Sequence, residues 1–415
     1  MRSTSLILGL AGGLLVSFIL MSLTDNDVKP SSNTKHDSSL QQSFKYNGTY
    51  SLYVSYEEGM TFQWITNLEE EGTFSLKDQK GKVIASGETE KSRIHKFSID
   101  KKSNGTVNLV FGGKDSGTEN VTLQPKFKRQ KGLYKKVDSI YVVGDVHGRY
   151  DQMIRLLENS GVVNSELQWS AGSAHLIFLG DLFDRGDDVT KVLWFIHKLE
   201  SQAEKKGGKV HLVLGNHEIM TMTNDLRYMS RKEKNISIAY KVGYDKMFHP
   251  TESYLGSWLT SKPSILKIDD LIMAHGGIID LGTPHIEEYN DQVYSYMNED
   301  MYLEILKDHA DSSAYDPDRW YRMKHFFYSD QAPFWYRGYV NSDTLSDQLN
   351  TMLNKYNSKV HIVAHTTQPT ITERYNGKVL TTDLDDAATQ LLFLTRKRNK
   401  YLRYKIDSEG IQTEL

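Results

Sequence analysis

Three motifs in the middle of the chain place metal-binding side chains directly after short apolar runs. They read SIYVVGDVHGRY from residue 139, HLIFLGDLFDRGDD from residue 175 and VHLVLGNHE from residue 210. Two later segments, LIMAHGG from residue 271 and VHIVAHTT from residue 360, end their apolar runs on a histidine. The candidate metal ligands in these segments are Asp145, His147, Asp181, Asn216, His275 and His365.

The types of these side chains indicate which chemistry they could support. Carboxylate, amide oxygen and imidazole ligands suit manganese, iron or zinc, and the chain contains no cysteine that would add a thiolate. Such a ligand set is typical of a site for two divalent or trivalent metal ions. Two cations about 3.5–4 Å apart can activate a bridging water and hold the oxygens of a phosphoryl group during in-line displacement. The residues therefore predict metal-assisted cleavage of a phosphate ester.

The apolar runs before these ligands are expected to be buried parallel strands. Strands that are covered on both faces lose the alternation of polar and apolar residues, and these runs have none. The glycine after each of the first three runs allows a sharp turn where the strand ends. Because ligands of open α/β sheets lie beyond the carboxyl ends of the strands, we expect the candidate ligands to converge in one crevice.

The motifs GDVHG, GDLFDRG and GNHE resemble the signature motifs of calcineurin-like metallophosphoesterases. The complete DRG and NHE forms are most similar to the phosphoprotein phosphatase branch of that family. Within the branch, DLRY at 225–228 and FWYRGY at 334–339 resemble the bacterial Shewanella-like protein phosphatases. The resemblance covers about residues 137–400. It implies an α/β fold, the four-layer metallophosphoesterase sandwich of two mixed sheets flanked by helices.

The resemblance also assigns roles to the candidate ligands. Asp145 and His147 would bind the first metal ion. Asp181 would bridge both ions, which suits a carboxylate because it has two oxygens. The remaining ligands, which would bind the second ion, are Asn216, His275 and His365.

Four further residues match catalytic positions of the family. His217 matches the general acid, and Asp184 matches the carboxylate that orients it. Arg185 and Arg337 match arginines that grip the phosphate. For Arg185 the alternative is a structural ion pair with Asp184 or a neighbouring aspartate, and for Arg337 it is stacking on an adjacent aromatic ring.

Other residues near the motifs have less specific assignments. Glu218 is interpreted as a structural partner. Arg227, in the first of two inserts that are expected to shape the substrate cleft, is either a fold-fixing arginine or a substrate contact. Asp383 and Asp385 follow the VLTT segment of a predicted hairpin with an Asn-Gly turn. They are candidates to contact the metal ligands without binding the metal themselves. Ala364 precedes His365 where relatives often carry glycine.

The composition limits the function classes. At 415 residues the chain exceeds a single typical domain of roughly 100–200 residues. Its formal net charge of −3 gives no basic footprint for nucleic acid, so nucleic acid is not an expected partner. Without cysteine, disulfides and thiol catalysis are excluded.

The first part of the chain predicts export. Residues 1–24 contain a nearly uncharged apolar run after Arg2, which predicts a signal peptide or a membrane anchor. Residues 25–43 are polar and predict a flexible linker. The expected location is therefore extracytoplasmic, either periplasmic or secreted, with a membrane contact through the N-terminal segment if it is not cleaved.

Two domains are predicted after the linker. Residues 44–132 contain short alternating segments separated by turn residues, which favours a small all-β, sandwich-like domain. Its role is either to bind or orient substrate or to act as a spacer. The metallophosphoesterase catalytic domain is expected at 137–415.

Together these features predict a metal-dependent phosphomonoesterase, a protein phosphatase with a preference for phosphotyrosine, in which His217 protonates the leaving group. Its partner would be a phosphorylated protein or peptide, or a small phosphoester. An alternative hypothesis is a nucleotide or dinucleoside polyphosphate hydrolase, or a broad-specificity extracytoplasmic phosphatase. A hypothesis of another class is a membrane-tethered binding protein with a degenerate phosphatase site.

Overall fold

A computed structural model describes residues 117–250, 253–298, 317–398 and 400–415, together with eight strands between residues 20 and 112. The chain forms two compact units. The first ends at Lys128 and also takes in Tyr240–Val242 and Thr251–Trp258, and the second contains the remainder.

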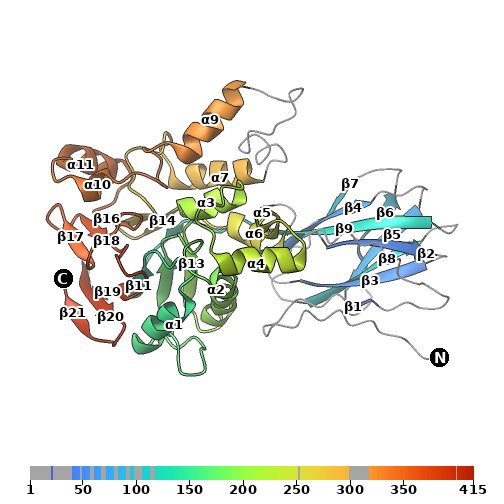
Figure 1. The fold of residues 1–415 in the computed structure, drawn as a ribbon, viewed down its shortest axis with the longest axis horizontal. Helices are drawn as coiled ribbons and strands as arrows, with labels where there is room; N and C mark the ends of the chain where they lie inside the picture. Colours follow the sequence, from blue (N-terminus) through green and yellow to red (C-terminus); the bar gives the residue numbers. More distant parts are fainter. Residues whose placement is uncertain are drawn as a thin grey trace. The chain divides into compact units, whose positions relative to one another are not determined.

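The second unit contains two six-stranded mixed sheets (Figure 1). The first sheet has the order β13-β12-β11-β19-β20-β21. In it β13, β12 and β11 run parallel, as the apolar runs predict, and β19, β20 and β21 continue it antiparallel. Its strands are β11 (Ser139–Val143), β12 (His175–Phe178), β13 (Lys209–Leu212), β19 (Gln390–Lys397), β20 (Lys400–Asp407) and β21 (Gln412–Glu414).

The second sheet has the order β10-β14-β15-β16-β18-β17. β15, β16 and β18 are parallel neighbours, so the two histidine segments also leave their sheet at the same edge. β17 and β18 form the predicted Asn-Gly hairpin, with Asn376 and Gly377 at φ 54° and 78°. The strands are β10 (Leu133–Tyr134), β14 (Ile265–Ile268), β15 (Leu271–Ala274), β16 (Val360–Val363), β17 (Thr372–Arg374) and β18 (Val379–Thr381).

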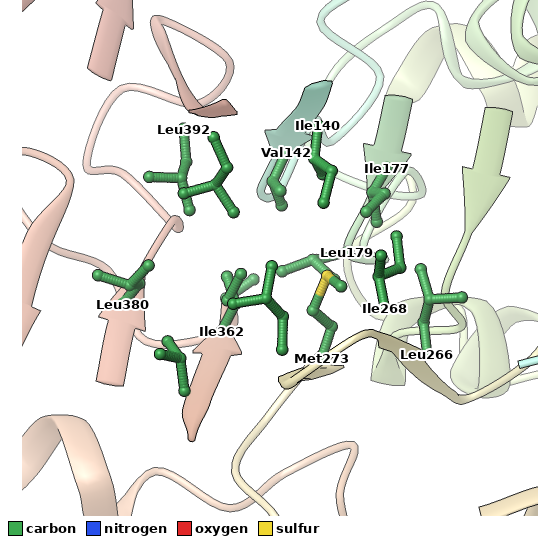
Figure 2. Packing of buried hydrophobic residues seen from close by; sticks show 14 of the residues in the cluster. Ile140, Val142, Ile177, Leu179, Leu266, Ile268, Met273, Ile362, Leu380 and Leu392 are labelled. Atoms are coloured by element: carbon green, nitrogen blue, oxygen red, sulfur yellow. The ribbon is translucent and has the colours of Figure 1, made fainter. Parts of the chain in front are cut away.

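Apolar side chains from both sheets form one buried core. Residues at alternate positions of a strand face the same side, so Ile140 and Val142 of β11 point into this core together. They meet Met273 of β15 and Ile362 of β16 from the other sheet, and Leu392 of β19 closes one side (Figure 2). The two sheets therefore pack face to face and hold their strand ends in fixed positions.

Helices cover the outer faces. In α2 the buried Val189, Val192, Leu193 and Ile196 follow helical spacing and give the helix one apolar side. This helix packs against β13, and α7 packs against β14 (Figure 1). The helices are α1 (Tyr150–Asn159), α2 (Val189–Glu204), α3 (Asn216–Met222), α4 (Arg231–Tyr240), α5 (Tyr244–Met247), α6 (Tyr254–Thr260), α7 (Ile286–Met297), α9 (Pro317–Tyr328), α10 (Gly338–Asn341) and α11 (Ser346–Lys355). The prediction of two mixed sheets flanked by helices is confirmed.

The first unit contains nine described strands in two sheets, with orders β1-β3-β8-β5-β6 and β2-β9-β4-β7. All of their pairings are antiparallel. The sandwich-like domain at 44–132 and the boundary to 137–415 stay predictions. The strands are β1 (Leu20–Met21), β2 (Leu40–Tyr46), β3 (Thr49–Tyr56), β4 (Met60–Thr66), β5 (Gly72–Asp78), β6 (Val83–Thr89), β7 (Ile94–Phe97), β8 (Gly105–Gly112) and β9 (Gly117–Phe127).

The predicted signal or anchor at 1–24 lies outside the described residues except for β1, and the predicted linker at 25–43 lies outside them except for the start of β2. Among the helices that the structure describes, none combines the length and the apolar character that a membrane crossing requires.

Candidate active site

The structure brings all the candidate metal ligands together at the carboxyl ends of the strands. Asp145 follows β11, Asp181 follows β12, and Asn216 begins α3 after β13. His275 follows β15 and His365 follows β16 in the other sheet. Each of the six predicted side chains is at most 4% exposed. Buried polar groups at this density must satisfy one another or a bound ion.

The loops after β12 and β13 lie so close together that glycine is required. Gly180 has φ 88°, and a Cβ added there would lie 2.5 Å from the backbone nitrogen of Gly215. A Cβ at Gly215 would lie 2.4 Å from Oδ1 of Asp181. The glycines predicted to permit turns therefore also permit the close approach that sets the spacing between the ligands.

The first group of ligands surrounds the ring of His147. Its Nδ1 donates to the carbonyl of Phe183 at 2.7 Å, so the neutral ring carries its lone pair on Nε2. Among the residues that the structure describes, that Nε2 has no hydrogen-bond partner, and it lies 3.5 Å from Oδ2 of Asp145 and 4.0 Å from Oδ2 of Asp181. A lone pair that faces two carboxylates is stable only with a positive charge between them.

The second group has the same arrangement around His275. Nδ1 donates to the carbonyl of Leu179 at 2.6 Å, so Nε2 is the nitrogen that faces the other candidate ligands. Nε2 lies 2.9 Å from Oδ1 of Asn216 and 3.2 Å from Oδ2 of Asp181. It is also 3.2 Å from Nδ1 of His365, whose own Nε2 has no hydrogen-bond partner in the described part of the chain. Histidines that bind metals commonly donate their other ring N–H to a backbone carbonyl in this way.

Asp181 belongs to both groups. Its carboxylate lies with His147 and His217 on one side and with His275 and His365 on the other, and within each group the ligand atoms lie within 4.8 Å of one another. This donor set of converging carboxylate, amide and imidazole groups fits two cations that share one carboxylate. Divalent metal ions are therefore compatible with the site.

The pKa values show the same demand for positive charge. Burial lowers the pKa of His275, but Asp181 and Asp145 outweigh it and raise that pKa to about 10. Burial and the neighbouring His275 lower the pKa of His365 to about 2. Burial, Asp145 and Asp181 raise the pKa of Asp383 to about 8. The carboxylates thus favour a proton or a cation at His275 and Asp383, whereas the ring of His365 stays neutral and can act as an acceptor.

His217 lies next to the candidate ligands, but its Nδ1 contacts a carboxylate, whereas Nδ1 of His147 and of His275 contacts a backbone carbonyl. Its Nδ1 is 2.6 Å from Oδ2 of Asp184, and both side chains are buried. Its backbone N–H donates to Oδ1 of Asp181 at 2.9 Å, which fixes the start of α3 against the ligand loop. Burial lowers the pKa of His217, but Asp181 and Asp184 raise it above its ordinary value. The imidazolium form is therefore favoured, with Nε2 as the proton-bearing atom that is not held by Asp184.

Both arginines keep most of their guanidinium group available. Arg185 is exposed, its backbone N–H donates to the carbonyl of Tyr228 at 2.9 Å, and among the described residues it forms no ion pair with Asp184 or Asp187. Arg337 is exposed and donates from Nη1 to the carbonyl of His365. Neither of the structural alternatives considered for these arginines is observed in the described part of the chain.

The structure defines the positions of three acidic residues near the candidate ligands, Glu218, Asp383 and Asp385. Glu218 is fully buried and accepts from the backbone N–H groups of Asp181 at 2.9 Å, Leu182 at 2.8 Å and Gly215 at 2.7 Å. It thereby anchors both ligand loops. Asp383 is buried near the ligands, whereas Asp385 is exposed. These contacts agree with the interpretation of Glu218 as a structural partner, and a glutamate at the third position of a helix is a known signal for bonding to the N-cap backbone.

The backbone at the site is also unusual. Left-handed φ angles occur at His147 (47°), Asp181 (50°), Asp184 (69°), Arg185 (62°) and His365 (65°). Residues with a Cβ adopt this region at a cost, and such strain concentrates at functional sites. The guanidinium of Arg227 forms a fork with both oxygens of Asp225 at 2.8 Å, and its side chain is 68% exposed.

Two curated proteins are similar to part of this chain in sequence. A plant protein, Shewanella-like protein phosphatase 2 of Arabidopsis thaliana, is 33% identical over 127 residues, which are 31% of this chain and 31% of the plant protein. The symmetrical bis(5'-nucleosyl)-tetraphosphatase of Vibrio campbellii is 30% identical over 140 residues, which are 33% of this chain and 44% of that protein. The chain thus spans less than half the length of these two relatives.

Among solved structures, the cold-active protein-tyrosine phosphatase of a psychrophilic Shewanella species superimposes with a TM-score of 0.60 and 29% identity, over 69% of this chain and 83% of that one. Its similarity and that of the plant phosphatase confirm the resemblance predicted from the motifs. The sequence pattern of calcineurin-like phosphoesterases matches residues 139–369, more than half of the chain. This chain therefore belongs to the calcineurin-like phosphoesterase family.

Proposed function

We propose that the chain hydrolyses phosphomonoesters on proteins or peptides with two bound metal ions, and that it prefers phosphotyrosine. The observation that carries the proposal is that two groups of candidate metal ligands share Asp181. They lie next to the hydrogen-bonded pair of His217 and Asp184. The names of the plant relative and of the Shewanella structure support the choice of substrate.

In this proposal the ligand sets follow the geometry. Asp145 and His147 would hold one ion and the remaining ligands the other, with Asp181 belonging to both ligand sets. When bound, two such ions supply an activated water and positive charge for the phosphoryl oxygens. The ligands of the second ion are Asn216, His275 and His365.

The other residues handle the phosphate and the proton. Asp184 holds Nδ1 of His217, so that Nε2 donates its proton to the ester oxygen as the phosphorus–oxygen bond breaks. Arg185 and Arg337 are both exposed at the site and hold phosphate oxygens with their planar, multidentate donors.

The test is phosphate release by the full chain, stripped of metal with a chelator and reloaded with manganese. Matched phosphotyrosine, phosphoserine and phosphothreonine peptides are compared with ATP and a dinucleoside tetraphosphate. We expect release from all three peptides and the highest kcat/KM on phosphotyrosine. Faster turnover of the nucleotides would favour the dinucleoside polyphosphatase alternative, which the Vibrio relative supports. Release that is unchanged in Asp181→Asn would instead favour a binding protein with a degenerate site.

We also propose that the protein acts outside the cytoplasm, because Leu6–Leu23 is an apolar run of signal or anchor type. Cell fractionation with an antibody against the C-terminal unit tests this proposal. Recovery of the chain in the cytoplasmic fraction would contradict it.

A further inference from the structure

A cavity of about 550 Å³ opens beside the metal ligands in the second unit. Its walls include three aromatic rings and the second of the two arginines. These rings and this arginine are Tyr328, Trp335, Tyr336 and Arg337. The proposed mechanism assigns Arg337 to the phosphate and leaves the aromatic walls without a role.

Two contacts join this cavity to the ligand cluster. The ring of Trp335 lies 5.8 Å from the ring of His365, centroid to centroid, at an interplanar angle of 89°. Arg337 donates to the backbone carbonyl of the same histidine. The cavity wall therefore begins one side chain away from a candidate metal ligand.

The aromatic wall is held in place from several directions. The indole N–H of Trp335 donates to the carbonyl of Phe327 at 2.7 Å. The ring of Tyr328 lies 5.9 Å from that of Trp335, and its hydroxyl forms a hydrogen bond with Oγ1 of Thr223, the residue after α3. Because these rings are fixed before a ligand binds, stacking against them requires little loss of side-chain freedom.

We propose that this cavity is the leaving-group subsite and that it binds the phenyl ring of phosphotyrosine. The inference rests on the proposed function and names the residues that would create its substrate preference. A phenyl ring is joined to phosphorus through a single oxygen, so it reaches a wall that adjoins the ligand cluster. The methylene group of phosphoserine presents no ring to Trp335, and a nucleobase is separated from its phosphate by a ribose.

The size of the effect follows from ordinary aromatic contacts. An aromatic pair contributes enough beyond buried area for about a 3- to 10-fold change in binding. Loss of the Trp335 ring is therefore expected to weaken binding of an aryl ligand by that factor and to leave a ligand without a ring nearly unaffected.

Inhibition constants of phenylphosphonate and methylphosphonate separate this effect from chemistry, because neither compound has an ester bond to cleave. They are measured on the manganese-loaded full chain against a phosphopeptide. The variants are Trp335→Leu, Trp335→Phe and the control Tyr321→Leu. Tyr321 is in α9, the helix that ends at Tyr328, is 67% exposed and is not among the residues that line the cavity.

In the unchanged protein we expect phenylphosphonate to bind more tightly than methylphosphonate. Trp335→Leu reduces this preference about 3- to 10-fold, while the constant for methylphosphonate stays within about 2-fold. Trp335→Phe keeps most of the preference, and Tyr321→Leu keeps all of it. An unchanged preference in Trp335→Leu overturns the subsite, and so does an equal loss for both compounds, which indicates a purely structural role. The proposed function fails separately, if the unchanged protein releases no phosphate from any peptide.

Discussion

Replacement of Glu218 by glutamine tests the view that this residue anchors both ligand loops. In the structure Oε2 accepts from Asp181 N at 2.9 Å and from Gly215 N at 2.7 Å, and Oε1 accepts from Leu182 N at 2.8 Å. A glutamine amide offers only one oxygen. At best it satisfies the first two donors and turns its NH₂ group towards the N–H of Leu182.

One buried donor without a partner costs about 1–3 kcal/mol. An opposing effect must be subtracted, because burial and the nearby Asp181 raise the pKa of Glu218 and a neutral amide escapes that repulsion. We therefore expect Glu218→Gln to lower the free energy of unfolding of the metal-free protein by about 1–2 kcal/mol. Affinity for manganese falls as well, since Asp181 loses its fixed position.

The assay is urea unfolding of the metal-free protein, compared through transition midpoints, with manganese titration by calorimetry alongside. Glu204→Gln is the matched control. Glu204 pairs with Lys209 at 2.9 Å but is 54% exposed at its side chain, so its loss is expected to change stability by less than about 0.5 kcal/mol. If Glu218→Gln behaves like this control in both measurements, the anchoring argument is wrong.

Three further outcomes follow from the site and the core. Asp181→Asn is expected to lower the manganese retained after desalting by at least one ion per chain, measured by elemental analysis, while the exposed Asp187→Asn retains the full amount. His217→Ala is expected to reduce kcat on a phosphoserine peptide about 10²-fold or more and to reduce it less on phosphotyrosine, because a phenolate needs less protonation; equal losses contradict its assignment as general acid. His361 is fully buried, and burial lowers its pKa to about 4. Between about pH 6.5 and pH 4 the imidazole is therefore protonated in the unfolded chain but neutral in the folded chain. Its contribution to stability is therefore complete above pH 6.5 and is lost as the pH falls towards 4, by up to about 1.4 kcal/mol per pH unit; urea midpoints of His361→Gln are expected to depend less on pH in this window, and parallel curves refute the assignment.

The ligand cluster could be predicted from the sequence because each ligand directly follows a recognisable strand. Asp145 and Asp181 follow apolar runs that form neighbouring parallel strands, and this arrangement fixes which end of the sheet they occupy. His275 and His365 follow β15 and β16 by the same rule in the other sheet. Local patterns thus sufficed where the position of a side chain depends only on its own strand.

The leaving-group cavity could not be predicted in this way. Trp335 lies in the loop after α9 and Tyr328 is the last residue of that helix, and their positions depend on hydrogen bonds with Phe327 and Thr223 rather than on a local sequence pattern. The left-handed backbone of Asp181 was equally hidden, because residues with a Cβ give no sign in sequence that they adopt positive φ. Tertiary contacts decided both features.

The seven-residue helix α3 connects these features physically. It begins with Asn216, His217 and Glu218, which are a candidate metal ligand, the candidate general acid and the loop anchor, and every residue in it is buried. The next residue, Thr223, is hydrogen-bonded to Tyr328 in the cavity wall. A helix this short is stabilised by its tertiary contacts rather than by its own turns. Its two ends are therefore fixed by the ligand loops on one side and by the aromatic wall on the other, so the position of His217 relative to the leaving-group cavity is set by a single rigid element.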